Sequence, residues 1–596
     1  MTPRRGGGGL GPRVASIERR GRFTVASPLF ERGPQATLDR GSAKVRSGDI
    51  ALVDFGPRGA RALRALGSAE RARDVVEALL WDTGDRRGFA RAIEEEAEEA
   101  VGMARELSVE RRDLTDLPTF TVDPATARDF DDAVSADVEG DGVRLWIHIA
   151  DVSAHVRPGS RLDAEALRRG TSTYVPGAVE PMLPRVLSDD ACSLSPGVER
   201  LAVTSEIVLS GNGEPRSANF FRSRIRSDAR LDYDQLDEIF AGRSQAPAAV
   251  ADPLKLARRA AATLAGRRPV GSLEIESFEP EFEFDDDGMV IGAQSVQQTE
   301  AHKLIEYLMI LTNERVAELC ERRHIPTVYR VHEQPDPQRI ERLIEQLASL
   351  DVPTPPLPKQ LSPSAAGELA GEVSRVVAKE AARRGHGRDA YTSLVLRSLK
   401  PAIYSERNLG HAGLGSTAYA HFTSPIRRYP DLVAHRALLS AVGAGEEGPA
   451  PDIVREAASR TSEREREATS IERHADRISA AFLLGRELFE GGWKREFAGE
   501  VSGVIGAGAF VRFGGELGDV YEGLLPVRRM RDDHFDLNET ETALVGRRSG
   551  REIRLGDPVS VRVDKVEATR GRVDLVAAGR EEPGGRGRGA RRRERR

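Results

Sequence analysis

The chain has 596 residues, of which 39% are hydrophobic and 31% charged, and its formal net charge is −6. This length and this supply of apolar residues predict about three to five folded domains and exclude a wholly disordered chain. No apolar run approaches the roughly 18 residues of a membrane span, and the N-terminus lacks the apolar segment of a secretory signal. Two cysteines, Cys192 and Cys320, are too few for a disulfide framework or a thiolate zinc site. We therefore expect a soluble, cytoplasmic, multidomain protein.

Positive charge is concentrated at the two ends of the chain. Residues 1–22 hold six arginines against one glutamate, and residues 580–596 hold eight arginines against three glutamates. The stretch between them is acidic. Basic ends are typical of tails that bind polyanions, and an acidic body can hold cations. Arginine outnumbers lysine by 80 to 8, which the codon bias of a GC-rich genome explains better than phosphate binding does.

The first part of the chain alternates between β and helical patterns. Residues 14–55 place short apolar runs between Gly and Pro turns, as expected of a small β-barrel. Residues 68–106 have helical composition. From about 115 to 230, strand-like runs are separated by Pro and Gly turns.

The second part is helical before it returns to strands. Helical patterns occupy residues 300–323, 336–350, 362–385, 388–406 and 427–443. A longer helix is predicted from Asp452, as its N-cap, to about Glu490, where Gly491 and Gly492 end it. Residues 496–578 again have β character. The predicted fold class is therefore α+β, with a mixed centre flanked by small β-barrels.

Four carboxylates lie within ten residues, at Asp123, Asp129, Asp131 and Asp132. Carboxylates this close repel one another unless a cation is present, and Mg²⁺ is usually held by a few carboxylates together with waters and substrate phosphates. In an extended chain Asp129 and Asp131 share one face, and a turn after Pro124 could fold Asp123 back toward them. The spacing alone leaves two interpretations open. One is a solvated acidic loop, which is commoner; the other is a metal site that activates a water molecule at a phosphodiester.

A series of motifs surrounds this cluster. They are Asp123-Pro-Ala-Thr-Ala-Arg-Asp-Phe-Asp-Asp132, Trp146-Ile-His-Ile-Ala-Asp151, Arg169-Gly-Thr-Ser-Thr-Tyr174, Ala301-His-Lys303, Tyr329-Arg-Val-His-Glu333 and His421-Phe-Thr-Ser-Pro-Ile-Arg-Arg-Tyr429. Over roughly residues 110–480 they closely resemble, in the same order, the ribonuclease II and ribonuclease R family, whose catalytic part is the RNB domain. The resemblance implies a processive 3′-to-5′ exoribonuclease that hydrolyses single-stranded RNA to nucleoside 5′-monophosphates, with Mg²⁺ or Mn²⁺ as cofactor.

The resemblance also implies roles for individual residues. Asp123, Asp129, Asp131 and Asp132 match the four active-site aspartates that hold the metal, and Asp131 has the most stringent catalytic role. Arg427 matches the catalytic arginine. With Arg428 it is expected to bind phosphate at the start of a helix, although such a pair is more often a solvated helix face.

Further residues match positions that contact RNA or lie near the site. Glu472 matches a glutamate that influences product release. Tyr174 and Phe282 match the two aromatic residues that clamp the terminal base, with Phe284 as the alternative to Phe282. Such a clamp accepts any base. The scattered histidines have no zinc-ligand spacing, so we expect them to be hydrogen-bonding structural residues.

Two flanking regions resemble small RNA-binding barrels. Residues 496–578 resemble the S1-type OB fold, in which Phe510, Phe513 and His534 are candidates for base stacking, although a core role for one of them is equally expected. Residues 14–65 resemble one cold-shock OB module without its usual aromatic-rich strands. Relative to ribonuclease R, an N-terminal helical domain and a second cold-shock module are missing, so a shortened ribonuclease R is the expected type.

The expected layout has six parts. They are a basic Gly/Arg-rich tail at 1–13, a cold-shock-like OB module at 14–65, a helical connector at 66–110, an RNB catalytic domain at 111–490, an S1-type OB domain at 496–578 and a second basic tail at 580–596. The expected partner is single-stranded RNA, with no DNA and no membrane, and the protein is expected to act as a monomer. The alternatives are a non-catalytic RNA-binding regulator on the same scaffold and, among enzymes, an endonuclease. The intact aspartates and Arg427 favour the exonuclease.

Overall fold

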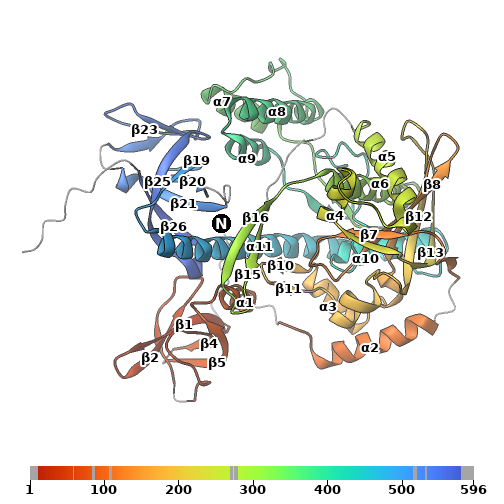
Figure 1. Cartoon of the computed structure of the whole chain (residues 1–596), viewed down its shortest axis with the longest axis horizontal. Helices are drawn as coiled ribbons and strands as arrows, with labels where there is room; N and C mark the ends of the chain where they lie inside the picture. Colours follow the sequence, from red (N-terminus) through yellow and green to blue (C-terminus); the bar gives the residue numbers. More distant parts are fainter. Residues whose placement is uncertain are drawn as a thin grey trace, which may run out of the picture.

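The fold is known from a computed structural model, which describes residues 11–39, 41–57, 59–82, 87–106, 110–268, 273, 279–514, 520–530 and 533–578. Residues 1–10 and 579–596, on which most of the two predicted basic tails fall, lie outside this part. Figure 1 shows two small β modules at one end of the molecule, a larger mixed region at the other, and helix α11 (Pro451–Gly491) running between them. No helix within the described ranges is long and apolar enough to cross a membrane.

The N-terminal module is a five-stranded antiparallel sheet that curls toward a barrel. Its strands are β1 (Arg13–Arg20), β2 (Phe23–Pro28), β3 (Ala36–Thr37), β4 (Asp49–Gly56) and β5 (Gly59–Ser68), in the order β3-β2-β1-β4-β5. Leu38, after β3, pairs with Ala60 on β5, so the two edges of the sheet meet. Ile17 is fully buried in the core inside this sheet, whereas Val14 and Ile50, on its other face, are fully buried against α1 (Ala72–Asp82). Helices α1 and α2 (Arg91–Glu106) follow, within the stretch predicted to be helical.

The central region is built on a seven-stranded sheet. Its strands are β6 (Arg112–Leu114), β7 (Phe120–Asp123), β8 (Asp132–Glu139), β9 (Gly142–Ala150), β12 (Glu199–Leu209), β13 (Pro215–Arg226) and β14 (Ala229–Asp232), in the order β14-β7-β8-β9-β12-β13-β6. Apolar residues of β7, β8 and β9 form one core with helices α5 (Ala251–Ala265), α6 (Glu300–Arg322) and α10 (Tyr429–Ala441). This sheet carries the carboxylate cluster at the ends of β7 and β8.

Shorter elements connect the central sheet to the rest. They are α3 (Arg161–Arg169), α4 (Tyr233–Phe240), the short helices at Val152–Ala154, Val186–Ala191 and Ala248–Val250, and the pairs β10 (Thr173–Val175) with β11 (Ala178–Glu180), β15 (Glu279–Phe284) with β16 (Val290–Val296) and β17 (Tyr329–Val331) with β18 (Ile403–Ser405). Helix α3 lies in the stretch that the sequence predicted to hold strands only. Ser160 caps it, because its side chain accepts a hydrogen bond from Asp163 N–H.

The remaining predicted helices are present, with two corrections at their ends. They are α7 (Pro337–Ser349), α8 (Pro363–Arg384), α9 (Arg388–Ser398) and α11. Helix α9 was predicted to reach residue 406 but ends at Ser398, because Pro401 cannot continue a helix and residues 403–405 pair as β18. Helix α11 begins at Pro451 with Ala450 as N-cap, so Asp452 lies in the first turn and is not the cap.

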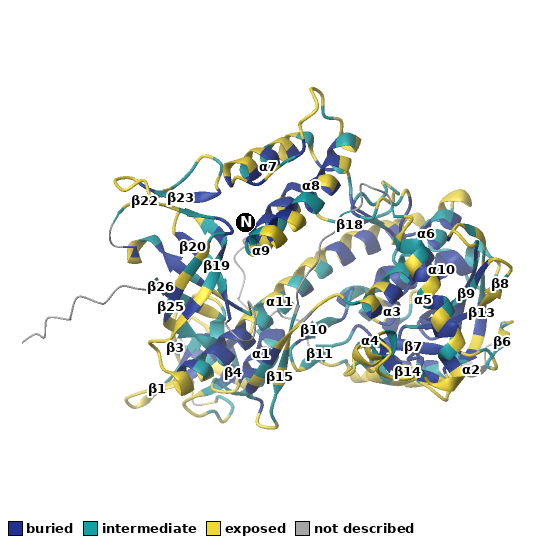
Figure 2. Cartoon of the chain, turned by 45° about the horizontal axis from the view of Figure 1, so that its top comes forward, coloured by how far each residue is buried: buried dark blue, intermediate teal, exposed yellow. Residues whose placement is uncertain are grey.

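The C-terminal module is a closed barrel of β19 (Glu496–Ile505), β20 (Gly508–Phe513), β21 (Tyr521–Pro526), β26 (Arg572–Ala577) and β25 (Pro558–Glu567). A separate small sheet of β22 (Phe535–Leu537), β23 (Ala543–Gly546) and β24 (Glu552–Arg554) is inserted between β21 and β25. Short helices lie at Val527–Arg529 and Ala568–Arg570. Figure 2 shows buried residues in dark blue along both the barrel strands and α8, and these belong to one apolar core shared by the barrel, α7–α9 and the end of α11.

Candidate active site

The acidic cluster lies at the junction of β7 and β8. Asp123 ends β7 and Asp132 begins β8, while Asp129 and Asp131 lie in the loop between them. A turn after Pro124 reverses the chain, since Ala127 N–H donates to the Pro124 carbonyl over 3.0 Å. The predicted turn is therefore present, and it brings Asp123 and Asp132 to the same end of the sheet.

The loop that carries Asp131 is fixed by residues distant in sequence. Ser193 Oγ accepts from Phe130 N–H at 3.1 Å and donates to the Arg128 carbonyl at 2.6 Å. Asp131 Oδ1 accepts from Ile426 N–H at 2.8 Å. The Ser193-Leu194 and Ser424-to-Arg427 motifs therefore hold the acidic loop in place.

Three carboxylates in this cluster have a buried oxygen without a hydrogen-bond partner among the described residues: Asp123 Oδ2, Asp131 Oδ2 and Asp132 Oδ2. Burial raises the pKa of Asp123 to about 8, with further increases from the nearby charges of Asp132 and Asp129. Burial also raises the pKa of Asp132 to about 6 and that of Asp131 well above its ordinary value. Buried, unpaired carboxylates are costly unless a cation compensates them.

These oxygens are the hard donors that a divalent ion prefers, so their chemistry fits Mg²⁺ or Mn²⁺. Within the described ranges, however, no three or more His, Cys, Asp or Glu side chains are gathered into a group that could hold a metal ion. The structure thus supplies buried carboxylate oxygens that have no hydrogen-bond partner among the described residues, but these side chains are not gathered around one point as metal ligands are.

Arg427 lies beside Asp131, as a catalytic arginine would. Its Nε is 3.6 Å from Asp131 Oδ2, and 46% of its side chain is exposed. The backbone of Arg427 is held by the Arg169-to-Tyr174 motif, because Ser172 N–H donates to the Arg427 carbonyl at 2.9 Å. The guanidinium is therefore held at the cluster while part of it faces solvent.

Arg428 has different surroundings. Its Nε and Nη2 donate to the two carboxylate oxygens of Asp431 at 2.9 and 2.7 Å, and burial of this pair fixes the start of α10. The helix begins at Tyr429, with Arg428 as its N-cap, so the two arginines precede the helix and do not form its first turn. In this structure the Arg428 guanidinium thus forms a bidentate ion pair with Asp431.

Tyr174 connects two other predicted residues. Its hydroxyl donates to Asp129 Oδ2 at 2.7 Å, and its backbone N–H donates to Glu472 Oε1 at 3.0 Å. Burial raises the pKa of the Tyr174 hydroxyl, and the charge of Asp129 raises it further, so the hydroxyl stays protonated and donates. Asp129 thus differs from the other three aspartates, because it has no buried oxygen that lacks a hydrogen-bond partner among the described residues.

The second predicted clamp residue, Phe282, lies on the β15–β16 hairpin. Phe282 and Phe284 are two residues apart on β15, and both are partly buried against the apolar core. A Cβ placed on Gly177, in the β10–β11 turn, would lie 3.5 Å from the Phe284 ring. The hairpin therefore lies beside the strand of Tyr174, with Phe284 at that turn.

In the C-terminal barrel one prediction is wrong. Phe513 is fully buried, and its ring centroid lies 5.2 Å from that of Phe497 and 5.6 Å from that of Tyr521. It is a core residue and cannot stack on RNA. Phe510 lies three residues earlier, so it points to the opposite face of β20 and is only partly buried. His534 is exposed.

The histidines have structural surroundings, as predicted. His148 is buried between Ser135 Oγ and Thr204 Oγ1, at 3.1 and 2.8 Å, and burial lowers its pKa to about 3. His435 stacks on Phe422, with ring centroids 4.1 Å apart. Neither is available as a ligand in a zinc cluster.

Tyr233 also lies at this site, although no pattern in the sequence pointed to it. Tyr233 follows Asp232 at the end of β14, and Asp232 pairs with Asp123 in the parallel β14–β7 register. Its ring stacks on His302 at 3.9 Å, and its pKa is raised by burial and by the charges of Asp132 and Asp123. The pairing joins segments more than 100 residues apart, so no local pattern placed Tyr233 beside the cluster.

Comparison with known proteins identifies the scaffold. The family model described as the RNB domain matches residues 111–444, and the model described as the S1 RNA binding domain matches residues 494–577. This chain belongs to the RNB-domain family. The first of these models covers the acidic cluster and Arg427, and the second covers the C-terminal barrel.

Full-length relatives are similar over most of this chain. Ribonuclease R of Escherichia coli is 34% identical over 566 residues, which cover 89% of this chain and 66% of that protein. Ribonuclease R of Aquifex aeolicus is 32% identical over 549 residues, which cover 89% of this chain and 75% of that protein. This chain thus spans just under two thirds of the length of the Escherichia coli relative.

Solved structures share the fold. The apo form of Mycoplasma genitalium RNase R superposes with a TM-score of 0.82 over 95% of this chain and 89% of that chain, at 24% identity. Yeast Ssd1, described as a pseudonuclease, superposes with a TM-score of 0.63 over 90% of this chain and 68% of that chain, at 16% identity. The same fold therefore occurs in proteins named as nucleases and in one named as a pseudonuclease, so the fold alone does not decide the activity.

Proposed function

We propose that this protein is a processive 3′-to-5′ exoribonuclease of RNA turnover. It hydrolyses single-stranded RNA to nucleoside 5′-monophosphates with a divalent metal ion, Mg²⁺ or Mn²⁺. The observation that carries the proposal is that buried oxygens of Asp123, Asp131 and Asp132 accept no hydrogen bond from the described residues and lie beside the half-exposed guanidinium of Arg427. We also propose that the protein acts as a cytoplasmic monomer on RNA and not on DNA, with the domain boundaries expected from the sequence.

The carboxylates are assigned to the metal. Asp123, Asp131 and Asp132 would hold it through their unpaired oxygens, with Asp129 as the fourth candidate ligand. A bound divalent ion polarises a phosphodiester and lowers the pKa of a water molecule that attacks phosphorus. Arg427 would neutralise the charge that develops on the phosphoryl oxygens. Its ion pair with Asp131, at 3.6 Å, is longer than a hydrogen bond, and the side chain is 46% exposed, so the guanidinium can reach a phosphate.

Other residues position the RNA. Tyr174 would present its ring to the terminal base, with Phe282 on the other side. Asp129 fixes the Tyr174 side chain through the hydroxyl, and Glu472 fixes its backbone. Because the terminal base sets where the scissile phosphate lies, these contacts connect base binding to hydrolysis. Phe510, on the outer face of the S1-type barrel, stays a candidate for contacts with RNA farther from the cut.

The alternative is a non-catalytic RNA-binding protein on the same scaffold. Such a protein has no need of three buried carboxylate oxygens that lack partners, which cost folding free energy. Their retention supports the catalytic function over the binding function.

The test is the hydrolysis of 5′-labelled single-stranded RNA by the wild type and by Asp131→Asn, with Mg²⁺ or with EDTA. An exposed aspartate on the strand that follows this loop, Asp137 of β8, provides the matched control Asp137→Asn. We expect the wild type and the control to shorten the RNA progressively to one small end product with release of mononucleotides, and only with metal. Asp131→Asn should bind the RNA without cutting it. Wild-type cleavage by Asp131→Asn would refute the metal assignment, and internal fragments would indicate an endonuclease.

A further inference from the structure

The small sheet β22–β24 has no part in closing the C-terminal barrel. The barrel closes through β19, β20, β21, β26 and β25, and β22–β24 form a sheet of their own. We call residues 533–557 the S1 insertion. Besides β19 of the barrel, it contacts α7 and the region around the start of α9. Helices α7–α9 are joined to the catalytic region through the paired strands β17 and β18 that flank them.

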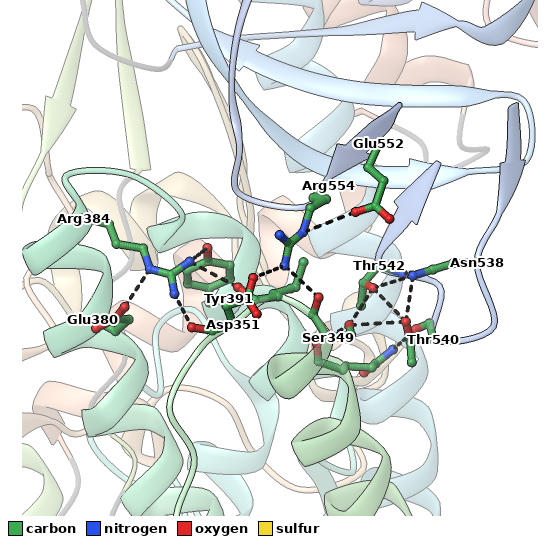
Figure 3. A network of polar contacts seen from close by, with 12 residues as sticks. Ser349, Asp351, Glu380, Arg384, Tyr391, Asn538, Thr540, Thr542, Glu552 and Arg554 are labelled. Carbon is green, nitrogen blue, oxygen red and sulfur yellow. Dashed lines mark hydrogen bonds and ion pairs between the residues drawn. The ribbon is translucent and has the colours of Figure 1, made fainter. Parts of the chain in front are cut away.

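The first contact is a set of polar bonds with the C-terminal end of α7 (Figure 3). Arg554 Nη2 donates to the Ser349 carbonyl at 2.7 Å and to Asp351 Oδ2 at 2.9 Å. The hydroxyls of Ser349 and Thr542 are 2.8 Å apart. Figure 3 also shows Asn538, Thr540 and Thr542 joined to one another on the insertion side of this contact.

Helix α7 adds two donors along its length. Gln346 Nε2 donates to the Thr540 carbonyl at 2.9 Å, and Arg342 Nη2 donates to the Glu539 carbonyl. Both acceptors are backbone carbonyls of the insertion. The helix therefore binds the backbone of the insertion. Substituting side chains of the insertion would leave these two hydrogen bonds in place.

The second contact is a close backbone approach at the end of the insertion. Gly556 has φ +81°, and a Cβ there would lie 2.8 Å from the Tyr391 ring and 3.0 Å from Gly387 Cα. His386 Nδ1 lies 2.6 Å from the Gly556 carbonyl oxygen. Only glycine fits this position, both for its backbone conformation and for the space.

Apolar residues connect the two contacts. Phe535, Leu544 and Leu555 of the insertion are buried in the same core as residues of α7 and α9, namely Ile340, Leu343, Ile344, Leu347, Leu394 and Val395. The insertion is therefore held by both apolar packing and directed polar bonds.

The barrel has a separate attachment to α11. Tyr521 OH donates to Glu487 Oε1 at 2.6 Å, and a Cβ on Gly571 would lie 2.7 Å from the backbone of Arg477. Attachment along one helix leaves a module able to rock about that helix.

The barrel also reaches α9 directly, because Gly387 N–H donates to Glu500 Oε2 at 2.7 Å. Arg512 of the barrel pairs with Asp389 in the same region. The insertion strengthens this second attachment and extends it to α7, which restricts rocking about α11.

We propose that the S1 insertion is a positioning element for RNA: it fixes the barrel on α7 and α9, so that RNA bound to the barrel enters the carboxylate site in one orientation. The inference rests on the proposed function. When two modules bind the same RNA molecule, binding at one raises the effective concentration of the RNA at the other only if the two modules are suitably placed relative to each other. Loosening the insertion therefore weakens the capture of long RNA and leaves the chemical step intact.

The test removes the polar bonds with the triple variant Arg342→Ala, Gln346→Ala and Arg554→Ala. The control is Arg547→Ala, because Arg547 pairs with Asp536 inside the insertion and makes no described contact with α7 or α9. For long RNA we expect the triple variant to raise KM roughly tenfold at unchanged kcat. The shortest RNAs that the enzyme cleaves, which cannot contact both modules, should keep the wild-type KM. An unchanged KM for long RNA, or a fall in kcat on short RNA, would overturn the proposal.

A second variant tests whether the contact stays closed during turnover. Ser349→Cys with Thr542→Cys places two thiols where the hydroxyls are 2.8 Å apart, and both native cysteines are buried. The oxidised, cross-linked protein should degrade long RNA as the reduced protein does. Activity that is lost on oxidation and recovered on reduction would mean that the contact must open, against the proposal.

Binding separates this inference from the proposed function. Filter binding of the long RNA in EDTA needs no hydrolysis. If the wild type cuts no RNA, the proposed function fails, yet a roughly tenfold weaker Kd of the triple variant still supports the positioning role. An equal Kd would refute that role.

Discussion

Replacing Asp132 by asparagine is expected to stabilise the folded protein while it abolishes hydrolysis. Asp132 begins β8, and its buried Oδ2 has no hydrogen-bond partner among the described residues. Burial raises its pKa from 3.8 to about 6, although Arg427 and Arg428 act in the opposite direction. Ionised Asp132 therefore lowers the stability of the folded state at neutral pH, and the amide of asparagine removes this cost.

The size and sign of the effect follow from proton linkage. A rise of about two pKa units corresponds to about 3 kcal/mol. The folded state binds this proton more tightly than the unfolded chain does, so the free energy of unfolding falls as pH rises from about 4 to about 6 and stays lower above that window. Because the new amide is itself unpaired, we expect Asp132→Asn to be more stable than the wild type by about 1–3 kcal/mol above pH 6. Below about pH 4 the difference should vanish, since the wild-type carboxyl is then protonated in both states.

Thermal unfolding in EDTA across this pH range measures the difference, and RNA hydrolysis is assayed on the same preparations. Added Mg²⁺ should raise the melting temperature of the wild type and have a smaller effect on Asp132→Asn, because a ligand stabilises the state that binds it. An asparagine variant that is less stable than the wild type at neutral pH in EDTA would refute the reasoning. It would mean that the carboxylate stabilises the fold.

Three further outcomes are expected. Asp151→Asn should destabilise the protein by about 3–5 kcal/mol in denaturant titrations, because buried Arg111 loses the carboxylate that pairs with it and buried Arg222 keeps only its ion pair with Glu446 among the described residues. A change of a few tenths of a kcal/mol would contradict this. Arg427→Lys should lower kcat about 10²–10³-fold, because lysine lacks the planar pair of donors of the guanidinium. The melting temperature should stay unchanged. A wild-type kcat would exclude a catalytic role for Arg427. Tyr174→Ala should weaken binding of the terminal base by about 1–3 kcal/mol and leave a longer end product on gels. Tyr174→Phe keeps the ring and should keep the product length. An unchanged end product in Tyr174→Ala would exclude a clamping role for Tyr174.

The motifs of the sequence predicted which residues meet at the site better than they predicted what each one contacts. Asp131 and Ile426, 295 positions apart, are hydrogen-bonded, and so are Tyr174 and Glu472, 298 positions apart. Only the resemblance could relate such distant segments, because periodicity and spacing describe neighbours along the chain. Tyr233 was missed for the same reason, since it reaches the cluster through the pairing of β14 with β7.

Two errors at single residues had a local signal. Phe510 and Phe513 are an odd number of positions apart on one strand, so they face opposite sides, and the apolar series Ala509, Val511 and Phe513 marks the inner side. Arg428 precedes Asp431 by three residues at a helix start, where an acidic side chain commonly pairs with the cap region. In both cases the residue type suggested RNA binding. The position of the residue, on the inner side of a strand or three residues before an aspartate at a helix start, indicated a structural role instead.

The four aspartates of the cluster differ in their hydrogen-bond partners, although their spacing in the sequence does not distinguish them. Asp129 accepts the Tyr174 hydroxyl, so the interior satisfies one of its oxygens with a neutral donor. Asp123, Asp131 and Asp132 keep a buried oxygen with no donor, and burial raises the pKa of each. Asp131 accepts a hydrogen bond from Ile426 N–H through its other oxygen, so the fold satisfies one oxygen of this residue and leaves the second without a donor. These three buried oxygens without a hydrogen-bond donor are therefore the better candidates to bind a cation, beside the positive charge of Arg427 at 3.6 Å from Asp131 Oδ2.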